Sequence, residues 1–376
     1  MTRPRLDAKI IAEPGETAEL WQSLPETHVF GPAQTSDWFS LWQSNVNRDC
    51  LLACLYAGET AVFVLPLEIN QIGPCRIAAY PGGPHANCNF PGVSPAHQIT
   101  SDDLKRLFDA LHRVRADIDL ISLERQLPTL DGYENPLLQL PSRENANISL
   151  AITLDRNFQT VLERHNAKRK WKKYRNTVRK FEEAGGYRIV TATTSGETDA
   201  MLENYLTNKA VKFAKSGIRN TFEPQTIQSF FKELFARHAG KVNPLFQLKA
   251  LEVAGQYRSV LGKSWAKSQT FIDFIGITED ALNNASPGEF LFFEDIRDSC
   301  QTSLSVYSFG VGDEPYKRSW CDLETAVYDT QISLTGRGKA YAGYLVTRGK
   351  LVRGIKKNER LWTAVKKMRS RLLGRN

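Results

Sequence analysis

The sequence predicts an α+β protein with two tandem domains of one architecture, each built around a mixed central sheet. The main observation is the order of predicted elements, because residues 187–334 give strand, helix, helix, three strands, helix, strand and helix. Residues 8–154 give nearly the same order, with a strand in place of the last helix. A chain of 376 residues is also long enough for two domains with cores of their own.

Basic charge is concentrated in two predicted helices, although the whole chain carries a net charge of +8. Residues 164–180 hold nine basic and no acidic side chains, and residues 337–376 hold thirteen basic side chains and one acidic. The remaining sequence has 27 basic and 40 acidic residues, a net charge of −13. This distribution argues against a general nucleic-acid binder and favours two local surfaces that face anions.

The composition is typical of a soluble globular protein, with 41% hydrophobic and 24% charged residues. No window approaches the roughly 18 apolar residues that a membrane span needs, and the N-terminus lacks the apolar region of a signal peptide. The six cysteines are scattered and form no CxxC pair. We therefore expect a cytoplasmic protein with reduced thiols and no metal site.

The predicted first domain covers residues 1–155. Ser36 and Asp37 begin a helix that places Trp38 and Trp42 on one face. Residues 57–59 form the turn of a hairpin. The predicted elements are strands at 8–12, 76–80, 118–123 and 147–154, helices at 17–24, 36–45 and 101–117, and a hairpin at 50–69.

The predicted second domain covers residues 156–336 and opens with the basic junction helix 158–184. An apolar stripe under its basic face, at spacings of four and three, predicts that one side packs inward. The other predicted elements are strands at 187–194, 245–253, 256–262, 269–275 and 304–309, and helices at 197–215, 224–239, from Ser286 and at 322–334. Residues 337–376 form a third segment, a basic amphipathic helix with Leu361, Val365, Met368 and Leu372 on one side.

Residues 286–322 contain the strongest candidate for a binding platform. Ser286 and Pro287 are start signals of a helix, whose N-terminal N–H groups attract an anion such as a pyrophosphate. A short strand follows and stops at a glycine-rich turn, GVGDEP, which presents Tyr316 and Lys317. Glu294, Asp295 and Asp298 on the intervening helix are interpreted as a solvated face.

Four stretches, together with the element order, resemble a known family. FGVGDEPYKRSWCD, residues 309–322, looks like the signature near the end of the second domain in the CelD-like branch of the GNAT acyltransferases. SPGEFLF, HNAKRKWKKYRNTVRKFEEAGG and PAQTSDWFSLWQ are similar to its later helix start, its basic helix and its N-terminal helix. The resemblance implies two tandem Fem-type GNAT domains and an acyl-CoA co-substrate, with acetyl-CoA as the simplest donor.

Two departures weaken the expected donor site. Ser308 stands where the family usually has an aspartate between two aromatic residues. The acetyltransferase pyrophosphate loop, Q/R-x-x-G-x-G/A, is absent between Ile275 and Phe290. CoA binding would then rest on the helix start at Ser286.

The candidate catalytic residues are Asp313, Tyr316 and Lys317. Tyr316 would give a proton to the leaving thiolate, or it packs beneath the turn. Asp313 would accept a proton from the acceptor, or it caps its turn. Lys317 would bind an anionic group or orient the reactants, or it is a surface lysine. Ser286, Gly288 and Lys317 are the candidate cofactor-binding residues, with plain helix initiation as the alternative for the first two.

The candidate substrate-binding residues are His85, Asn87, Asn89, Lys168 and Arg169. The first three lie in a Gly/Pro/Asn-rich stretch, which either lines a cleft or is a turn-rich connector. The two basic residues would face phosphates of CoA or of a glycan, or they belong to a solvated face.

These residues predict acyl transfer from acyl-CoA to an amine or hydroxyl of a sugar or polysaccharide precursor. One alternative is a Fem-like aminoacyl transferase that binds aminoacyl-tRNA through the basic junction helix. Another is a non-catalytic GNAT-fold protein of polysaccharide machinery. The C-terminal helix either docks on the acidic body or makes peripheral membrane contact.

Overall fold

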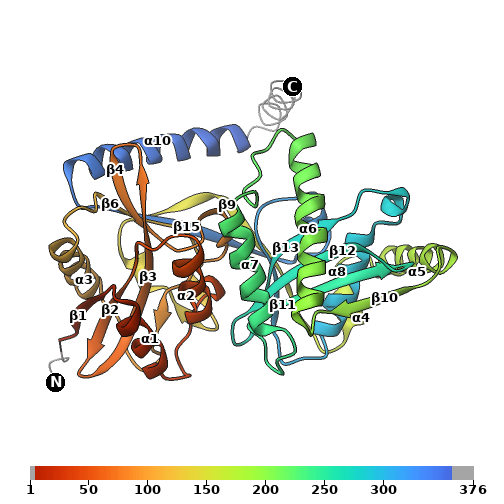
Figure 1. Cartoon of the computed structure of the whole chain (residues 1–376), viewed down its shortest axis with the longest axis horizontal. Helices are drawn as coiled ribbons and strands as arrows, with labels where there is room; N and C mark the ends of the chain where they lie inside the picture. Colours follow the sequence, from red (N-terminus) through yellow and green to blue (C-terminus); the bar gives the residue numbers. More distant parts are fainter. Residues whose placement is uncertain (1–4, 358–376) are drawn as a thin grey trace. The chain divides into compact units, whose positions relative to one another are not determined.

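The computed structural model describes residues 5–357, which form two compact units (Figure 1). Among the described residues, the first unit comprises 5–148 and 325–357, and the second comprises 149–324. The first unit's first segment ends at residue 148, whereas the sequence places the boundary at 155. Residues 325–336, which the sequence places in the second domain, belong to the first unit. The predicted side chains beyond residue 357, including Leu361 and Val365, lie outside the described part.

The first unit has three α-helices between its strands and a fourth after its last strand. Thr100 begins α3 with a capping box, in which its hydroxyl accepts from the Asp103 N–H and Asp103 accepts from the Thr100 N–H. The elements are β1 (Asp7–Ile11), α1 (Pro14–Ser23), η1 (Pro32–Gln34), α2 (Ser36–Asn45), β2 (Cys50–Ala57), β3 (Thr60–Ile72), β4 (Cys75–Ala79), η2 (Gly83–His85), β5 (Gly92–Val93), α3 (Ser101–Val114), β6 (Leu120–Gln126), β7 (Thr129–Leu130), β8 (Tyr133–Glu134), η3 (Pro136–Gln139) and α10 (Gly336–Lys357).

The sheet of the first unit has the strand order β1-β2-β3-β4-β6-β15, where β15 is Leu323–Ser333. The first four strands pair antiparallel, and β4 then pairs parallel with β6 across the α3 connection. β2 and the centre of β3 are buried on both faces, which explains their nearly continuous apolar sequence. The sheet is therefore mixed, as predicted.

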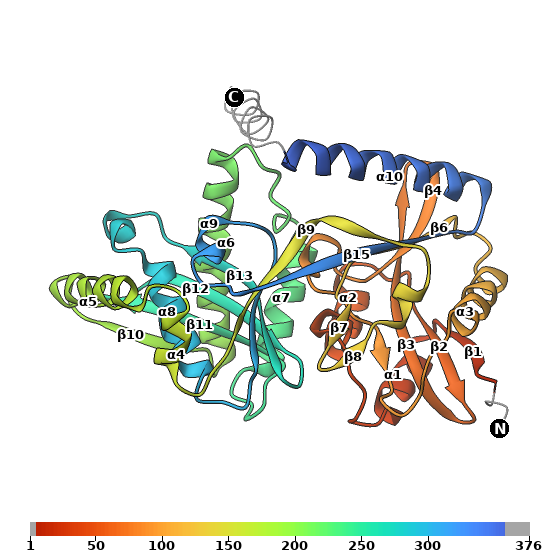
Figure 2. The same cartoon turned by 180° about the vertical axis from the view of Figure 1, so that it is seen from behind.

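Helix α10 packs on the first unit. Tyr341, Ala342 and Leu345 lie against the buried side chains of Cys75, Ile77 and Leu120 on β4 and β6. Figure 2 shows α10 beside these two strands. The prediction that the basic C-terminal helix docks on the body or contacts a membrane rests on side chains beyond residue 357, and it stays a prediction.

The second unit repeats this order after two further helices. Its elements are α4 (Phe158–Glu163), α5 (Ala167–Glu183), β10 (Tyr187–Thr191), α6 (Ser195–Lys215), α7 (Gln225–His238), β11 (Phe246–Val253), β12 (Gln256–Trp265), β13 (Gln269–Ile277), η4 (Ala281–Ala285), α8 (Pro287–Ser299), β14 (Val306–Val311) and α9 (Pro315–Arg318). The predicted single helix 158–184 is two helices, because Asn166 adopts a left-handed conformation and caps α5 through the Arg169 N–H.

The sheet of the second unit runs β10-β11-β12-β13-β14, with the antiparallel strand β9 beside β14. β13 and β14 pair parallel across the α8 connection. α6 and α7 cover one face of β11, β12 and β13, and α8 covers the opposite face (Figure 1). The order of antiparallel and parallel strand pairs matches that of the first unit.

Two strands connect the units along the chain, β9 (Ser142–Thr153) and β15 (Leu323–Ser333). β9 pairs with β14 of the second unit through residues 149–153, and β15 pairs with β6 of the first unit through residues 328–333. The predicted helix at 322–334 is therefore wrong. Thr, Val, Tyr and Ile are frequent in this stretch and favour a strand, and pairing with β6 satisfies its backbone.

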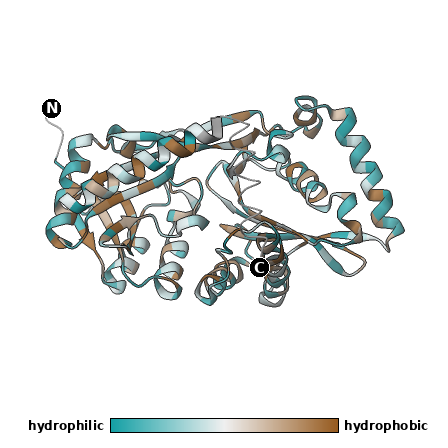
Figure 3. Ribbon diagram, turned by 90° about the horizontal axis from the view of Figure 1, so that it is seen from above, coloured by the Kyte–Doolittle hydropathy of each residue, from teal (hydrophilic) through white to brown (hydrophobic). Residues whose placement is uncertain are grey.

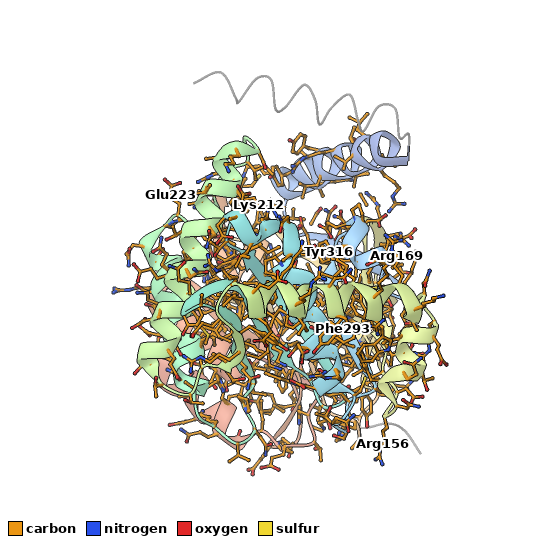
Figure 4. All side chains as sticks on the ribbon, turned by 90° about the vertical axis from the view of Figure 1, so that its right-hand side faces the viewer. Arg156, Arg169, Lys212, Glu223, Phe293 and Tyr316 are labelled. Atoms are coloured by element: carbon orange, nitrogen blue, oxygen red, sulfur yellow. The ribbon has the colours of Figure 1, made fainter. Side chains whose placement is uncertain are left out.

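The core of the second unit on the α8 side is aromatic. Phe293 is 3% exposed and lies 4.4 Å from the Tyr174 ring, 4.9 Å from Phe158 and 5.1 Å from Trp171, measured between ring centroids. Figure 4 shows Phe293 among the inner side chains, whereas Arg169 lies at the periphery. The apolar stripe predicted for the basic helix is thus confirmed, because Trp171 and Tyr174 of α5 pack on α8.

Within residues 5–357, no helix is long and apolar enough to cross a lipid bilayer. Figure 3 shows hydrophobic residues along the strands and a largely hydrophilic α5 at the right-hand side.

Replacing Phe293 by alanine should lower the free energy of unfolding by about 3–5 kcal/mol, because a large cavity would remain among three aromatic rings. Denaturant unfolding followed by tryptophan fluorescence measures this, since Trp171 belongs to the cluster. The control is Val242→Ala at a position that is 94% exposed, where no change is expected. Equal stability of the two variants would contradict the assigned core.

Candidate active site

Two strands of the second unit separate where the candidate site lies. β13 and β14 pair only at Gln269–Val306, Thr270–Tyr307 and Phe271–Ser308. Beyond these pairs β13 continues to Ile277 and β14 to Val311. Past the last pair, the backbone N–H and C=O groups by which β13 and β14 face each other are not paired between the two strands. An extended ligand that carries amides can form hydrogen bonds with them.

Asp273 lies at a bulge of β13, just past the point of separation. On β12, Gly262 pairs with Phe274 and Lys263 pairs with Ile272, so Asp273 is the extra residue between them. Its Oδ1 accepts a hydrogen bond of 2.9 Å from the Ser264 hydroxyl. Its Oδ2 is shielded from solvent and has no hydrogen-bond partner among the described residues. The bulge thus directs a carboxylate with one unpaired, shielded oxygen into the protein.

Burial raises the pKa of Asp273 to about 7, and the hydrogen bond from Ser264 offsets only part of this effect. A carboxylate with a pKa near neutrality can take a proton from an amine or hydroxyl at physiological pH. Asp273 is therefore the strongest candidate for a general base within the second unit. Strongly perturbed carboxylates of this kind are typical of functional sites.

The start of α8 lies at the end of the loop that follows β13. Ser286 adopts a left-handed conformation, and its side chain makes no capping hydrogen bond to α8. The first N–H groups of a helix lack intrahelical partners, so this end carries positive partial charge. A side chain at Gly288 would meet Ile277 at 2.7 Å, which means that Gly288 allows α8 to pack closely on β13.

The basic helix α5 lies beside this helix start. Thr177 donates to the Ala285 carbonyl at 3.0 Å, and Lys173 forms an ion pair with Glu289 in the first turn of α8. The cavity between them measures only about 10 Å³, which leaves no room for a diphosphate on this side. Lys168 and Arg169 are exposed at the beginning of α5. They remain available to an anion, whereas Lys173 is neutralised.

Lys170 differs from its neighbours because it is buried. Its ammonium lies 3.3 Å from the centroid of the Trp320 ring. Burial lowers its pKa to about 8, although Glu289 acts in the opposite direction. Lys170 therefore anchors α5 to the aromatic core.

The three predicted catalytic residues lie in and before α9. Lys317 is 5% exposed, donates to the Val311 carbonyl at 3.2 Å and pairs with Glu314 at 2.9 Å. Asp313 binds Arg318 through both oxygens, at 2.6 and 3.1 Å. The charges of Lys317 and Asp313 thus stabilise the turn, and Lys317 is not a surface lysine.

Tyr316 is 41% exposed and stacks on Phe292 with ring centroids 5.7 Å apart. Partial burial, with a further contribution from Glu314, raises the pKa of its hydroxyl. Tyr316 is therefore protonated at neutral pH, as a general acid must be. Its catalytic role stays a prediction.

Helix α6 crosses β13 beyond Asp273. A side chain at Gly276 would meet the Tyr205 ring at 2.7 Å, so the glycine permits this close crossing. One turn later the Lys209 ammonium lies 5.0 Å from the Phe213 ring centroid. Burial lowers the pKa of Lys209 to about 8, although Glu314 acts in the opposite direction. A second side chain that titrates near neutrality therefore lies on the same face as Asp273.

A buried ion cluster holds α8 against the sheet. Asp295 is fully buried and lies 2.7 Å from the ammonium groups of both Lys249 and Lys263. The Tyr307 hydroxyl donates to its other oxygen at 2.9 Å. Burial alone would raise the pKa of Asp295, but the two lysines lower it below its usual range. The interpretation of Asp295 as part of a solvated face was therefore wrong.

The three residues predicted from the loop at 81–92 lie in the first unit. His85 is 9% exposed and its ring centroid is 6.4 Å from that of Trp42. Asn87 accepts a hydrogen bond from Arg125, and the buried Asn89 accepts from Gln34 and donates to the Glu124 carbonyl. These contacts order the loop, and a role in binding an acceptor stays a prediction. No group of His, Cys, Asp or Glu arranged to hold a metal ion is found in the described part.

Residues 167–318 match the family model described as an acetyltransferase (GNAT) domain. These residues have the GNAT fold. The whole chain is similar in structure to FemX, with a TM-score of 0.57, 10% identity and coverage of 85% of this chain and 96% of that one. It is also similar to L-PGS from Bacillus licheniformis, with a TM-score of 0.52, 9% identity and coverage of 90% and 97%.

A third similar structure is the C-terminal domain of a putative lysylphosphatidylglycerol synthetase from Agrobacterium fabrum, with a TM-score of 0.51 and 13% identity. That similarity covers 88% of this chain and 96% of the other. At these identities the similarity shows the fold alone. No curated protein matches the sequence significantly. The predicted α+β class with tandem GNAT-like units is confirmed, and the CelD-like branch stays a prediction.

The sequence analysis missed Asp273 and Lys209. An aspartate inside an otherwise apolar strand, FIDFIGI, is a signal that could have identified the first. Lys209 gives no such signal, because it lies on a helix whose other lysines are exposed.

The Asp273→Asn substitution should raise the free energy of unfolding above pH 7 and leave it nearly unchanged near pH 4. The folded state holds the Asp273 proton more tightly than the unfolded chain, so this contribution to stability is lost as pH rises from about 4 through 7. The gain at pH 8 should be roughly 2–4 kcal/mol. Denaturant unfolding at both pH values measures it, with Glu203→Gln on the exposed face of α6 as the control. A stability difference independent of pH would contradict the raised pKa.

Proposed function

We propose that this protein is an acyltransferase that uses an acyl-CoA, such as acetyl-CoA, and acylates an amine or hydroxyl of a sugar or polysaccharide precursor. The donor would bind in the second unit. The observation that carries the proposal is the separation of β13 and β14 directly beside Asp273. The GNAT fold of residues 167–318 supports the reaction class.

The separated strands suit the chemistry of CoA. Its pantetheine arm contains two amides, which can pair with the unpaired edges of β13 and β14 as an added strand does. The uncapped start of α8 offers N–H groups to the diphosphate, although α5 leaves only the side away from Lys173 open. Exposed Lys168 and Arg169 supply further positive charge for the phosphates.

Asp273 would act as the general base. It takes the proton of the acceptor as the new C–N or C–O bond forms, and the C–S bond of the thioester then breaks. The thiolate that leaves accepts a proton, for which Tyr316 is the predicted donor. The thioester is already activated, so positioning and these two proton transfers are sufficient and no covalent enzyme intermediate is needed.

The Asp273→Asn variant should bind acetyl-CoA as the wild type does but lose about 100-fold or more in kcat, because only the proton acceptor is removed. Isothermal titration measures the binding, and release of the CoA thiol with glucosamine or cello-oligosaccharides measures turnover. Wild-type turnover should also fall below pH 7, where Asp273 becomes protonated.

The control in both measurements is Glu203→Gln on α6, which should behave as the wild type. Absence of binding of acetyl-CoA and of longer acyl-CoAs to the wild type would overturn the CoA proposal. Full turnover by Asp273→Asn would instead overturn the role of Asp273.

The exposed cations of α5 favour a second candidate, a Fem-like aminoacyl transfer from aminoacyl-tRNA. Arg169, Lys172 and Arg175 are all exposed, and tRNA presents many phosphates along such a helix. Binding of tRNA through this face should weaken by roughly two orders of magnitude or more between 50 and 200 mM salt. Fluorescence anisotropy measures it, with the Arg169→Glu/Lys172→Glu variant as the test and Lys241→Glu as the control. Binding that neither salt nor the double variant weakens would exclude this candidate.

A further inference from the structure

The sheet of the first unit also separates, and a cavity of about 540 Å³ lies at the separation. β4 and β6 pair only at Ile77–Leu120 and Ala78–Ile121. β6 then continues to Gln126, whereas β4 ends at Ala79. Helix α10 contributes Tyr341, Leu345 and Arg348 to the cavity wall.

The charges on the cavity wall cancel. Two carboxylates, Glu68 and Glu124, face two guanidinium groups, Arg125 and Arg348. Glu68 accepts from the Trp42 indole at 3.0 Å and from the Gly82 N–H at 3.2 Å. A ligand with a large net charge therefore gains little electrostatic attraction here. A ligand with many polar groups can form hydrogen bonds with both donors and acceptors of the wall.

Some buried polar groups in this wall lack partners. Ser122 is 6% exposed, and its hydroxyl has no hydrogen-bond partner within residues 5–357. Arg125 donates to Asn87 and to the Gly83 carbonyl, but its buried Nε is likewise unpaired. Unsatisfied buried polar groups are rare in native proteins, and these two add to the polar character of the wall.

The cavity continues into a second hollow of about 560 Å³ along α10. Glu124, Asn145, Asn147, Leu345 and Arg348 line both. Asn145 is fixed by two hydrogen bonds to Asp329, at 2.9 and 2.8 Å. Together the hollows form an elongated groove rather than a site for one small group.

The start of α3 in the first unit differs from the start of α8, the candidate anion site of the second unit. The N-terminal N–H groups of α3 meet a complete capping box, and Asp102 and Asp103 lie in its first turn. The capping box occupies N–H groups that a diphosphate would otherwise accept from. The groove of the first unit is therefore unsuited to a second acyl-CoA.

We propose that this groove binds a neutral, polyhydroxylated ligand, a short oligosaccharide without phosphate. Carboxylates, amides and hydroxyls on one wall match the alternating donors and acceptors of sugar hydroxyls. Tyr341 and Leu345 supply apolar surface for the faces of the rings. The inference concerns the first unit alone and does not depend on acyl-CoA as the donor.

Isothermal titration of the full chain with cellotetraose, chitotetraose and maltotetraose tests the proposal, beside tetragalacturonate as a charged counterpart. At least one neutral tetrasaccharide should bind, and tetragalacturonate should bind at least tenfold more weakly. Glu124→Gln removes a wall carboxylate and Glu124→Trp fills the groove, so each should weaken the neutral ligand at least tenfold. Position 124 is exposed, which makes both variants compatible with folding.

Glu59→Gln and Glu59→Trp, in the exposed turn between β2 and β3, are matched controls that should bind as the wild type does. All variants should keep wild-type binding of acetyl-CoA, so failure of this site is distinguishable from failure of the donor site. The proposal is overturned if none of the neutral sugars binds, if binding survives Glu124→Trp, or if the uronate binds best.

Discussion

A buried carboxylate, Asp295, links α8 to three strands of the sheet in the second unit. It contacts Lys249 on β11, Lys263 on β12 and Tyr307 on β14. Removing one member of such a cluster typically costs about 3–5 kcal/mol, because an unpaired charge is left in the interior. Hydrophobic contacts alone would allow α8 to slide, whereas a carboxylate bound on both oxygens fixes its register. The position of the helix start at Ser286 follows from this constraint.

The same cluster limits where β13 and β14 can separate. Tyr307 holds β14 at the second of its three pairs with β13, and Ser308 forms the last pair before the strands part. The bulge at Asp273 follows directly on β13 and increases the local twist. The pKa of Asp295 on one face is lowered and that of Asp273 on the other is raised to about 7, because only Asp295 has cationic neighbours. One carboxylate thus stabilises the unit, and the other is available for proton transfer.

The sequence predicts the fold well where signals are local. The start of α8, the hairpins and the glycine turn before α9 are at the expected places, because capping and turn chemistry act within a few residues. The helix predicted at 322–334 is a strand: its strand-favouring residues are a weak local signal, and the pairing with β6 that decides it spans about two hundred residues. The site is predicted less well. Lys317 and Asp313 are where the motif suggests, yet the partners that neutralise them, Glu314 and Arg318, depend on side-chain directions in the folded turn.

The two units share one architecture but differ in the surroundings of their separated strands. Both sheets part after a few parallel pairs that follow a helical connection, so each creates unpaired edges at the same topological position. The start of the connecting helix, α8 in one unit and α3 in the other, would determine whether an anionic group is favoured there. Ser286 leaves the start of α8 without a side-chain cap, whereas Thr100 and Asp103 close the start of α3 and add negative charge. These contrasts support the proposals of an anionic donor in the second unit and of a neutral ligand with many hydroxyls in the first, where charged groups of both signs line the groove.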